Sequence, residues 1–425
     1  MRRRPVLIAL GSIVLTALVV LLIANFSLGD KQVDQRIEPL YGTHDPQFVR
    51  TQSAMLGPPI LNGNRVSALV NGEEIFPAML AAIRSAQRTI TFETYIYWAG
   101  DIGKEFAEAL SDRARAGVKV HVLLDWIGSE KLDAELLESM KRAGVEVERY
   151  NPAHWYNLWK VNHRTHRKLL VIDGSVGFTG GVGIADNWQG DARNPDQWRD
   201  THFRLEGPAV GQMQAAFMDN WVQVTGNVLH GPDYFPQLDP VGPHGVEIFT
   251  SAPGGGAESM QLMYLLSIAA ARQSIQLSAA YFVPDNVAIN MLVDALRRGV
   301  KVQIIVPGPH IDTEVVRRAS RASWGKLLRA GAEIYEYQPT MFHCKVMVVD
   351  DIWTSVGSTN FDTRSFSVND EANMNVYDVA FAKRQREIFE QDLSRSRRVS
   401  LKEWEQRPLL EKALERTADL FSSQL

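Results

Sequence analysis

The chain has 425 residues, of which 45 % are hydrophobic and 22 % are charged, and its single cysteine is Cys344. This length is too great for one ordinary domain and suits two of about 150 to 200 residues, each with its own core. The composition excludes a disordered or fibrous protein, and one cysteine excludes an internal disulfide or a cysteine zinc cluster. A net charge of -4 argues against a surface that follows nucleic acid, so nucleic acid is not expected as a partner.

The N-terminus is typical of a membrane anchor. Three arginines at 2–4 precede an apolar run from about Pro5 to Phe26, which is long enough to span a bilayer. Only Lys31 and Arg36 follow soon afterwards, so the charge balance places the N-terminus in the cytoplasm and the remaining chain outside it. A cleaved signal peptide is the alternative, although its apolar region would be shorter and no clear cleavage site follows.

After this segment the sequence divides into two parts that repeat each other. The break lies at 231–245, where four prolines and three glycines forbid a long helix or a central strand. The same patterns follow in the same order on both sides, and a period this long indicates duplicated domains. We predict, in order, a transmembrane anchor (1–28), a linker (29–60), a first lobe (61–230), an inter-lobe linker (231–256) and a second lobe (257–425).

Each lobe is predicted to alternate strands with helices. The first repeat opens with the strand TITFETYIYW, after which Asp101 is expected to cap a helix that ends at Gly117. A β-branched strand follows the glycine, which gives the order strand, helix, strand, helix, strand and implies an α/β fold, with a sheet flanked by helices in each lobe. The matching segments are 89–98 and 274–285, 116–125 and 298–307, and 141–152 and 328–339.

One short phrase occurs in both halves, as HRKLLVID at 166–173 and as HCKVMVVD at 343–350. On a strand, side chains alternate, so the histidine and the lysine of each copy project from one face. A turn, a second strand and a small-residue corner follow each copy, SVGFTGG at 175–181 and TSVGSTN at 354–360, where glycines allow backbone N–H groups to approach an anion. A lone histidine and lysine usually lie at a solvated surface, but the duplication favours a site that holds and attacks a phosphoryl group.

Both copies resemble the HxKxxxxD signature of the phospholipase D superfamily. Further phrases resemble its cardiolipin synthase branch from about residue 60 to the end: WRDTHFRLEGPAV (198–210), AYFVPD (280–285), GSTNFDTRSFSVNDEAN (357–373) and SLKEWEQRPLLEKALER (400–416). The resemblance implies two similar lobes, each a mixed sheet flanked by helices, whose pseudo-twofold axis brings both motifs into one cleft. The catalytic set that it implies is His166, Lys168, Asp173, His343, Lys345 and Asp350.

The resemblance also implies a division of roles within this set. One histidine attacks phosphorus to form a phosphohistidine, and the other protonates the departing alcohol. By the habit of the family His166 is the nucleophile, although the near symmetry of the halves allows the reverse assignment. Lys168, Lys345 and Asn360 would hold the non-bridging oxygens, so neither a metal nor another cofactor is needed.

Supporting residues are expected around the histidines. Asp200 and Glu371 follow their histidines by 34 and 28 residues, and we assign them to orient the imidazoles. Asp173 and Asp350 are expected to fix the turn after each motif in preference to contacting substrate. The corner residues Ser358, Gly180 and Gly181 complete the predicted site.

One position departs from the family pattern. The corner usually reads GGxN, but here GGVG places Gly183 where asparagine is expected, whereas the second corner keeps Asn360. An oxyanion donor contributes about 3 kcal/mol, so we expect a backbone N–H or a water to replace the amide, or turnover to be slower. Glu93, at the end of the first strand, is a further candidate for the cleft.

Two other segments have more than one interpretation. The aromatic and basic run at 154–168 fits either a lipid interface or a loop packed on the other lobe. The leucines between Leu401 and Leu420 recur at helical spacing, which fits either a helix lying on a membrane or an ordinary docking face.

The predicted function is a membrane-anchored phosphatidyltransferase. It would cleave one phosphatidylglycerol, keep the phosphatidyl group on histidine and pass it to the hydroxyl of a second, releasing glycerol. A phospholipase D that uses water as the acceptor is the nearest alternative, because the two reactions differ only in which hydroxyl reaches the intermediate. A nuclease of the same superfamily and an inactive lipid-binding protein are further alternatives, and the sequence leaves the oligomeric state open.

Overall fold

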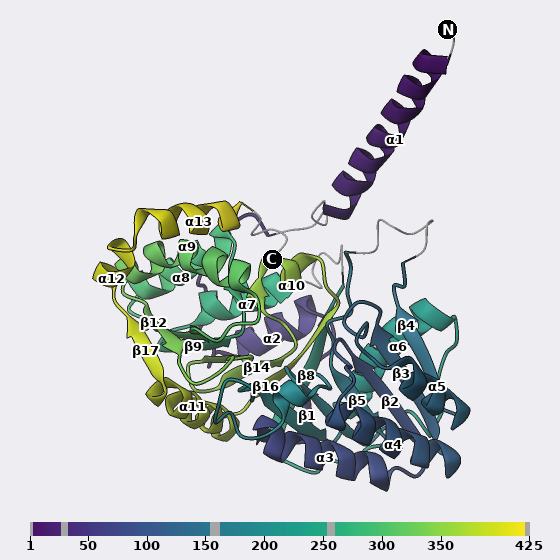
Figure 1. The fold of residues 1–425 in the computed structure, drawn as a ribbon. Helices are drawn as coiled ribbons and strands as arrows, with labels where there is room; N and C mark the ends of the chain where they lie inside the picture. Colours follow the sequence, from purple (N-terminus) through teal and green to yellow (C-terminus); the bar gives the residue numbers. More distant parts are fainter. Residues whose placement is uncertain (1–2, 27–32, 154–161, 253–259, 421–425) are drawn as a thin grey trace.

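The computed structural model describes residues 3–26, 33–153, 162–252 and 260–420 (Figure 1). The first lobe contains β1 (Leu61–Val70), α3 (Asn71–Ser85), β2 (Thr89–Thr94), α4 (Asp101–Arg115), β3 (Lys119–Asp125), α5 (Ala134–Arg142), β4 (Glu146–Tyr150), β5 (Leu169–Ile172), β6 (Val176–Gly180), η2 (Asp186–Trp188), β7 (Thr201–Glu206) and α6 (Val210–Thr225).

The second lobe repeats this order and adds a C-terminal extension. It contains β8 (His244–Ser251), α7 (Met260–Ala270), β9 (Ser274–Ala279), β10 (Phe282–Val283), α8 (Asn286–Arg297), β11 (Lys301–Pro307), α9 (Glu314–Ala330), β12 (Glu333–Tyr337), β13 (Lys345–Val349), β14 (Trp353–Gly357), β15 (Phe361–Asp362), α10 (Thr363–Ser367), β16 (Glu371–Tyr377), α11 (Val379–Ser394), β17 (Ser396–Val399), α12 (Leu401–Glu405) and α13 (Leu409–Asp419).

Most described strands of both lobes join into one 15-stranded sheet, in the order β17-β12-β11-β9-β13-β14-β16-β8-β1-β7-β6-β5-β2-β3-β4, and β10 pairs with β15 in a separate two-stranded sheet. The order is mirrored about the antiparallel junction of β1 with β8. In each half three successive strands, β2-β3-β4 and β9-β11-β12, pair in parallel, and the strands nearer the junction are antiparallel. The added edge strand β17 pairs antiparallel with β12. The predicted α/β fold with two mixed-sheet lobes is confirmed, and Figure 1 shows the lobes side by side.

Local sequence accounts for these elements. Ile102, Phe106 and Leu110 lie on one face of α4 and are all buried, as the amphipathic pattern predicts. The cap of this helix was predicted wrongly, because α4 starts at Asp101 itself. The carboxylate of Asp186 instead accepts hydrogen bonds from the backbone N–H groups of Asp101 and Ile102, at 3.1 and 3.0 Å. A side chain distant in sequence therefore replaces the local cap.

The predicted linkers are partly structured. Within 29–60, α2 (Pro46–Met55) packs the fully buried Phe48 against the core of the second lobe. Apolar side chains in this segment draw it onto that lobe. Strand β8 lies inside the predicted inter-lobe linker and pairs with β1 and β16, so this region joins the two halves of the sheet.

The N-terminal helix α1 covers Arg3–Phe26, and its side chains are described for residues 9–21. Within the described part of the chain, no helix combines the length and the apolar character needed to cross a bilayer. The predicted single-pass anchor at 1–28 is not confirmed.

Candidate active site

Backbone pairing between the lobes positions the two histidines. The N–H of His166 donates to the carbonyl of Asp370 at 2.8 Å, and the N–H of His343 donates to the carbonyl of Arg199 at 2.7 Å. In each case the segment before one HxK motif pairs with the segment before the acid of the other lobe. The two connections are related in the same way as the lobes themselves.

Because of these connections, each histidine contacts the acid of the other lobe. The Nδ1 atom of His166 lies 2.9 and 3.0 Å from the two carboxylate oxygens of Glu371, which belongs to the second lobe. Nδ1 of His343 lies 2.8 Å from Oδ2 of Asp200, which belongs to the first lobe. The structure thus places both predicted acids on imidazoles, but each acid orients the histidine of the opposite half.

Both histidines line a single cavity of about 150 Å³ between the lobes. This arrangement brings the two motifs together, as the resemblance implies. The lining residues are Tyr95, Ile96, Arg164, His166, Lys168, Trp188, Trp198, Tyr281, Asp312, His343, Asn360, Asp362, Arg364, Ser365 and Asn369.

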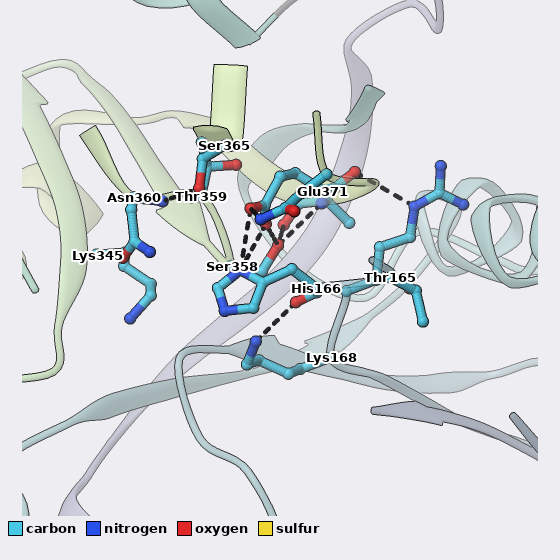
Figure 2. A network of polar contacts seen from close by, with 12 residues as sticks. Thr165, His166, Lys168, Lys345, Ser358, Thr359, Asn360, Ser365 and Glu371 are labelled. Atoms are coloured by element: carbon cyan, nitrogen blue, oxygen red, sulfur yellow. Dashed lines mark hydrogen bonds and ion pairs between the residues drawn. The ribbon is translucent and has the colours of Figure 1, made fainter. Parts of the chain in front are cut away.

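The two lysines lie beside the imidazoles. Nζ of Lys168 donates to the carbonyl of His166 at 2.6 Å, and Nζ of Lys345 lies 3.1 and 3.2 Å from the ring nitrogens of His343. Figure 2 shows both lysine side chains near His166. Burial lowers the pKa of Lys168 to about 7, and it lowers the pKa of Lys345 as well. An anion that enters the cavity would therefore favour their charged forms.

Burial also sets the protonation of the imidazoles. It lowers the pKa of His166 to about 4 despite the charge of Glu371, and it lowers the pKa of His343 with a further contribution from Lys345. Both rings are therefore neutral at neutral pH. A neutral ring that donates Nδ1–H to a carboxylate keeps a free electron pair on Nε2, the form required of a nucleophile or a base.

The two carboxylates are ionised and held by further donors. Burial alone would raise their pKa, but His166 and Lys168 lower that of Glu371 to about 2, and His343 lowers that of Asp200. Figure 2 shows Ser358, whose hydroxyl donates to Oε2 of Glu371 at 2.5 Å. Ser358 therefore supports the carboxylate that holds His166.

Trp188 holds the other carboxylate and was missed by sequence reasoning. Its indole Nε1 donates to Oδ2 of Asp200 at 3.0 Å, and its ring lies 5.3 Å from that of His343. The residue belongs to η2, after the first corner, and no motif marks it. Its only sequence signal is a tryptophan in a glycine-rich loop.

The glycines Gly180 and Gly181 of the first corner lie behind the cavity wall and beside the residues of β7. Neither residue lines the cavity. A Cβ atom at Gly181 would collide with the carboxylate of Asp200, and one at Gly180 would lie 2.6 Å from Nδ1 of His202. The N–H of Gly181 instead faces the carbonyl of Thr201 at 3.4 Å. These glycines make room for the acid that orients His343.

The aspartates that end the motifs lie away from the cavity, which corrects their inclusion in the catalytic set. Asp173 accepts hydrogen bonds from three successive backbone N–H groups at the start of β2. Asp350 does the same at the start of β9 and also accepts from the hydroxyl of Thr43 at 2.7 Å. Both have positive φ, 51° and 52°. Their role lies in the turn and the adjoining strand.

The corners differ at the position of the expected amides. Asn360 lines the cavity, as predicted, and its backbone N–H donates to the hydroxyl of Ser365 at 3.3 Å (Figure 2). At Gly183 a Cβ atom would lie 2.7 Å from Cβ of Ile96, which lines the cavity there. The wall of the first half is thus apolar where the second half presents an amide.

Glu93 does not line the cavity. Its carboxylate is fully buried and accepts from Thr165 at 2.5 Å and from Asn220 at 2.7 Å. These contacts hold the strand end next to His166, so the sequence hypothesis that Glu93 faces the cleft is wrong.

Two arginines of the cavity were also missed. Arg164 precedes the first motif, and Arg364 follows Asn360 on α10. The guanidinium of Arg364 donates to the side-chain and backbone oxygens of Asn162, at 2.9 and 2.8 Å, and so connects the two lobes. Arg364 lies in the phrase 357–373 that carries the resemblance, and Arg164 lies in the aromatic and basic run at 154–168. Of the run at 154–168, residues 154–161 lie outside the described part of the chain.

Comparison with known proteins agrees with this geometry. The family described as "Cardiolipin synthase, PLD-like domain" matches residues 79–218 and 264–393. The chain is 36 % identical over 363 residues to the major cardiolipin synthase ClsA of Bacillus subtilis (strain 168), which covers 84 % of this chain and 75 % of that protein. It is 35 % identical over 367 residues to a cardiolipin synthase of Geobacillus kaustophilus (strain HTA426), which covers 86 % and 73 %.

Among solved structures, a phosphatidylserine synthase of Haemophilus influenzae Rd KW20 superimposes with a TM-score of 0.65. It covers 89 % of this chain and 100 % of that one at 13 % identity, a likeness that concerns the fold alone. Fold and paired motifs define an enzyme of the phospholipase D superfamily. Within that superfamily, the chain belongs to the cardiolipin synthase family.

Proposed function

We propose that this enzyme transfers a phosphatidyl group from one phosphatidylglycerol to the hydroxyl of a second, forming cardiolipin and releasing glycerol. The observation that carries the proposal is the pair of neutral imidazoles that line one cavity, each held by a carboxylate of the other lobe. The names of the related proteins support the choice of lipid.

In the first step, Nε2 of His166 attacks phosphorus and the bond to the glycerol oxygen breaks. The leaving oxygen takes a proton from His343, which becomes neutral. In the second step, neutral His343 takes the proton of the acceptor hydroxyl, whose oxygen displaces His166 from phosphorus. His343 gives one proton in the first step and recovers one in the second, so the enzyme returns to its starting protonation state.

His343 must carry a proton before the first step, although burial disfavours its charged form. A phosphodiester bound beside the ring supplies a negative charge, which raises the pKa of an imidazole. Substrate binding therefore favours the protonated form of His343, which acts as the acid. His166 is assigned as the nucleophile because both oxygens of Glu371 hold its Nδ1 and burial lowers its pKa to about 4.

Lys168, Lys345 and Asn360 are proposed to stabilise the non-bridging oxygens. Charged and amide donors that are fixed before the reaction stabilise the negative charge that develops on those oxygens. The lysines lie within 3.2 Å of atoms of the two histidines, which supports this role. We also propose that the enzyme works at a membrane to which residues 1–28 attach it, with the N-terminus in the cytoplasm.

The test incubates the purified full chain with phosphatidylglycerol vesicles and resolves the products by lipid mass spectrometry. Cardiolipin with an equal amount of glycerol is the expected result. Phosphatidic acid as the main product would identify a hydrolase, and absence of both would identify an inactive lipid-binding protein. A parallel incubation with plasmid DNA tests the nuclease alternative, for which we expect no cleavage.

A further inference from the structure

Helix α13 presents leucines to the outside of the molecule. Leu409, Leu410 and Leu420 are 83 %, 71 % and 80 % exposed, and Leu414 is 39 % exposed. At 100° per residue these side chains, with Ala413 between them, fall on one side of the helix. We call this set the leucine face.

The opposite side of α13 packs on the protein and includes a buried ion pair. Glu415 is only 3 % exposed, and its carboxylate accepts from Nε of Arg407 at 3.0 and 2.9 Å and lies 3.2 Å from Nε of Arg321. An amphipathic helix at the surface of a soluble domain usually turns its apolar side to the core and its charged side to water. Here an ion pair anchors the helix and the leucines face away from the protein, so α13 has the reverse orientation.

The buried side of α13 also touches the wall of the active-site cavity. Ala418 packs with Val283, Val316 and Ala319, and Tyr281 packs against the same cluster. Tyr281 lines the cavity. In Figure 1 α13 runs along the upper edge of the second lobe, and α10, which contributes Arg364 to the cavity, lies toward the same edge.

The size of the cavity restricts what part of a lipid it accepts. Its volume is about 150 Å³. A phosphodiester with part of its glycerol fits such a volume, and two acyl chains do not. The chains must therefore remain in the bilayer while the headgroup reacts, so the elements beside the cavity have to lie at the lipid surface.

We propose that the leucine face docks into the interfacial layer of an anionic phospholipid bilayer and holds the cavity against it. Lys412 and Arg416 border the leucines on one side, where cations attract anionic headgroups. The inference rests on the proposed function in one respect, namely that the substrate is a bilayer lipid. It identifies the part of the surface through which that lipid is reached.

A fluorescent label on the leucine face tests the docking directly. The full chain with Leu410→Cys is labelled with an environment-sensitive dye, and native Cys344 is buried, so that labelling is specific for the new thiol. With phosphatidylglycerol vesicles we expect a blue shift and quenching by brominated acyl chains. The control places the same label at Val228→Cys, an exposed position beyond α6, where neither change is expected. Unchanged emission at position 410 would overturn the proposal.

Activity provides the second test. The triple variant Leu409→Gln, Leu410→Gln, Leu420→Gln should transfer phosphatidyl groups on vesicles at least tenfold more slowly, with unchanged turnover of a monomeric short-chain phosphatidylglycerol. The matched control, Val228→Gln with Val379→Gln, should be normal on both substrates. An equal loss on both substrates would contradict docking and indicate damage to the fold.

The same samples separate this proposal from its rivals. A wild-type chain that turns over neither substrate would refute the proposed function, while the label at position 410 would still decide the docking. In sedimentation velocity without lipid, a wild-type dimer that becomes monomeric in the triple variant, together with a blue shift that needs no vesicles, would identify the leucine face as a contact between copies of this chain. That result would overturn the membrane proposal.

Discussion

The two halves of the site contain the same kinds of catalytic side chains but differ in the residues that line the cavity around them. Each half contributes a histidine and a lysine at the entry to one strand, β5 or β13, and the acid that holds the other half's histidine. Around this frame, the first half presents Ile96 and the second presents Tyr281, and Gly183 stands opposite Asn360.

Matching backbone pairs fix this correspondence. Tyr97 pairs with Ile184 in the first half, as Phe282 pairs with Phe361 in the second, and both pairs are parallel. The two halves thus have the same histidine, lysine and acid positions, whereas the residues that line the cavity beside them differ. One cavity built from two copies therefore provides unlike surroundings for two like imidazoles, as a nucleophile and an acid require.

Removing either imidazole should have the largest effect. His166→Ala and His343→Ala should each lower transfer by about 10⁴-fold or more, because the two act on the same phosphorus. Steady-state assay of cardiolipin formation measures the loss. If the lobes carried independent sites, each single variant would keep about half of the activity.

A substrate with a good leaving group should separate the two roles. A p-nitrophenyl phosphodiester needs no acid for its departure, so His343→Ala should release one equivalent of nitrophenol in a burst, whereas His166→Ala should release none. The opposite pattern would reverse the assignment of nucleophile and acid.

Substitution of the two exchanged acids should have the next largest effect on turnover. Glu371→Gln should impair His166 and Asp200→Asn should impair His343, each lowering turnover by about 10³- to 10⁴-fold through loss of the correct tautomer. In the nitrophenyl burst assay, only Glu371→Gln should slow the burst, although Glu371 is in the same lobe as His343. A burst slowed by Asp200→Asn alone would contradict the exchange.

The exchange of acids also shows how much of the site could be predicted from the sequence. The repeated HxK phrase and the acids could be found because they recur with the duplication, and the alternation of strands and helices gives the mirrored sheet. Which acid meets which histidine depends on the bridges that His166 and His343 form across the junction, and no local pattern encodes those. Trp188 and the cap by Asp186 were missed for the same reason, since both act between segments that meet only in the folded chain. Glycines of the first corner were misread because room for a ligand and room for a carboxylate have the same sequence signal.

The unequal corners should respond differently to exchange. Asn360→Gly should slow turnover by about 10²-fold, because one oxyanion donor is lost. Gly183→Asn should instead destabilise the fold by about 1 to 3 kcal/mol, because the new side chain meets Ile96. Urea denaturation and initial rates distinguish the two outcomes. The double variant Ile96→Ala, Gly183→Asn is the control and should recover stability.

Acid should destabilise the protein through the buried imidazole. The pKa of His166 is about 4 in the fold and 6.5 as the ordinary value, so below pH 6.5 the unfolded chain binds the proton more readily. The contribution of neutral His166 to the free energy of unfolding is fully present above pH 6.5. It falls by about 3 kcal/mol as the pH drops toward 4. Urea midpoints across this range measure the loss, and His166→Asn should flatten the profile. An equally steep profile in that variant would contradict the burial argument.

The motif aspartates should show the smallest effect on chemistry. Asp173→Ala and Asp350→Ala should each cost about 2 to 3 kcal/mol of stability, because backbone donors lose a carboxylate, while the folded variants keep their rate per molecule. Asp350→Ala should cost more, since Asp350 is buried and also holds Thr43.

The number of covalent adducts per chain tests the shared site most directly. Rapid quenching of the wild-type enzyme with the nitrophenyl phosphodiester, followed by mass spectrometry of intact chains and of peptides, counts phosphoryl groups on histidine. One adduct per chain, on His166, is the predicted result. Two adducts on one chain, at His166 and His343 together, would show that each half reacts by itself.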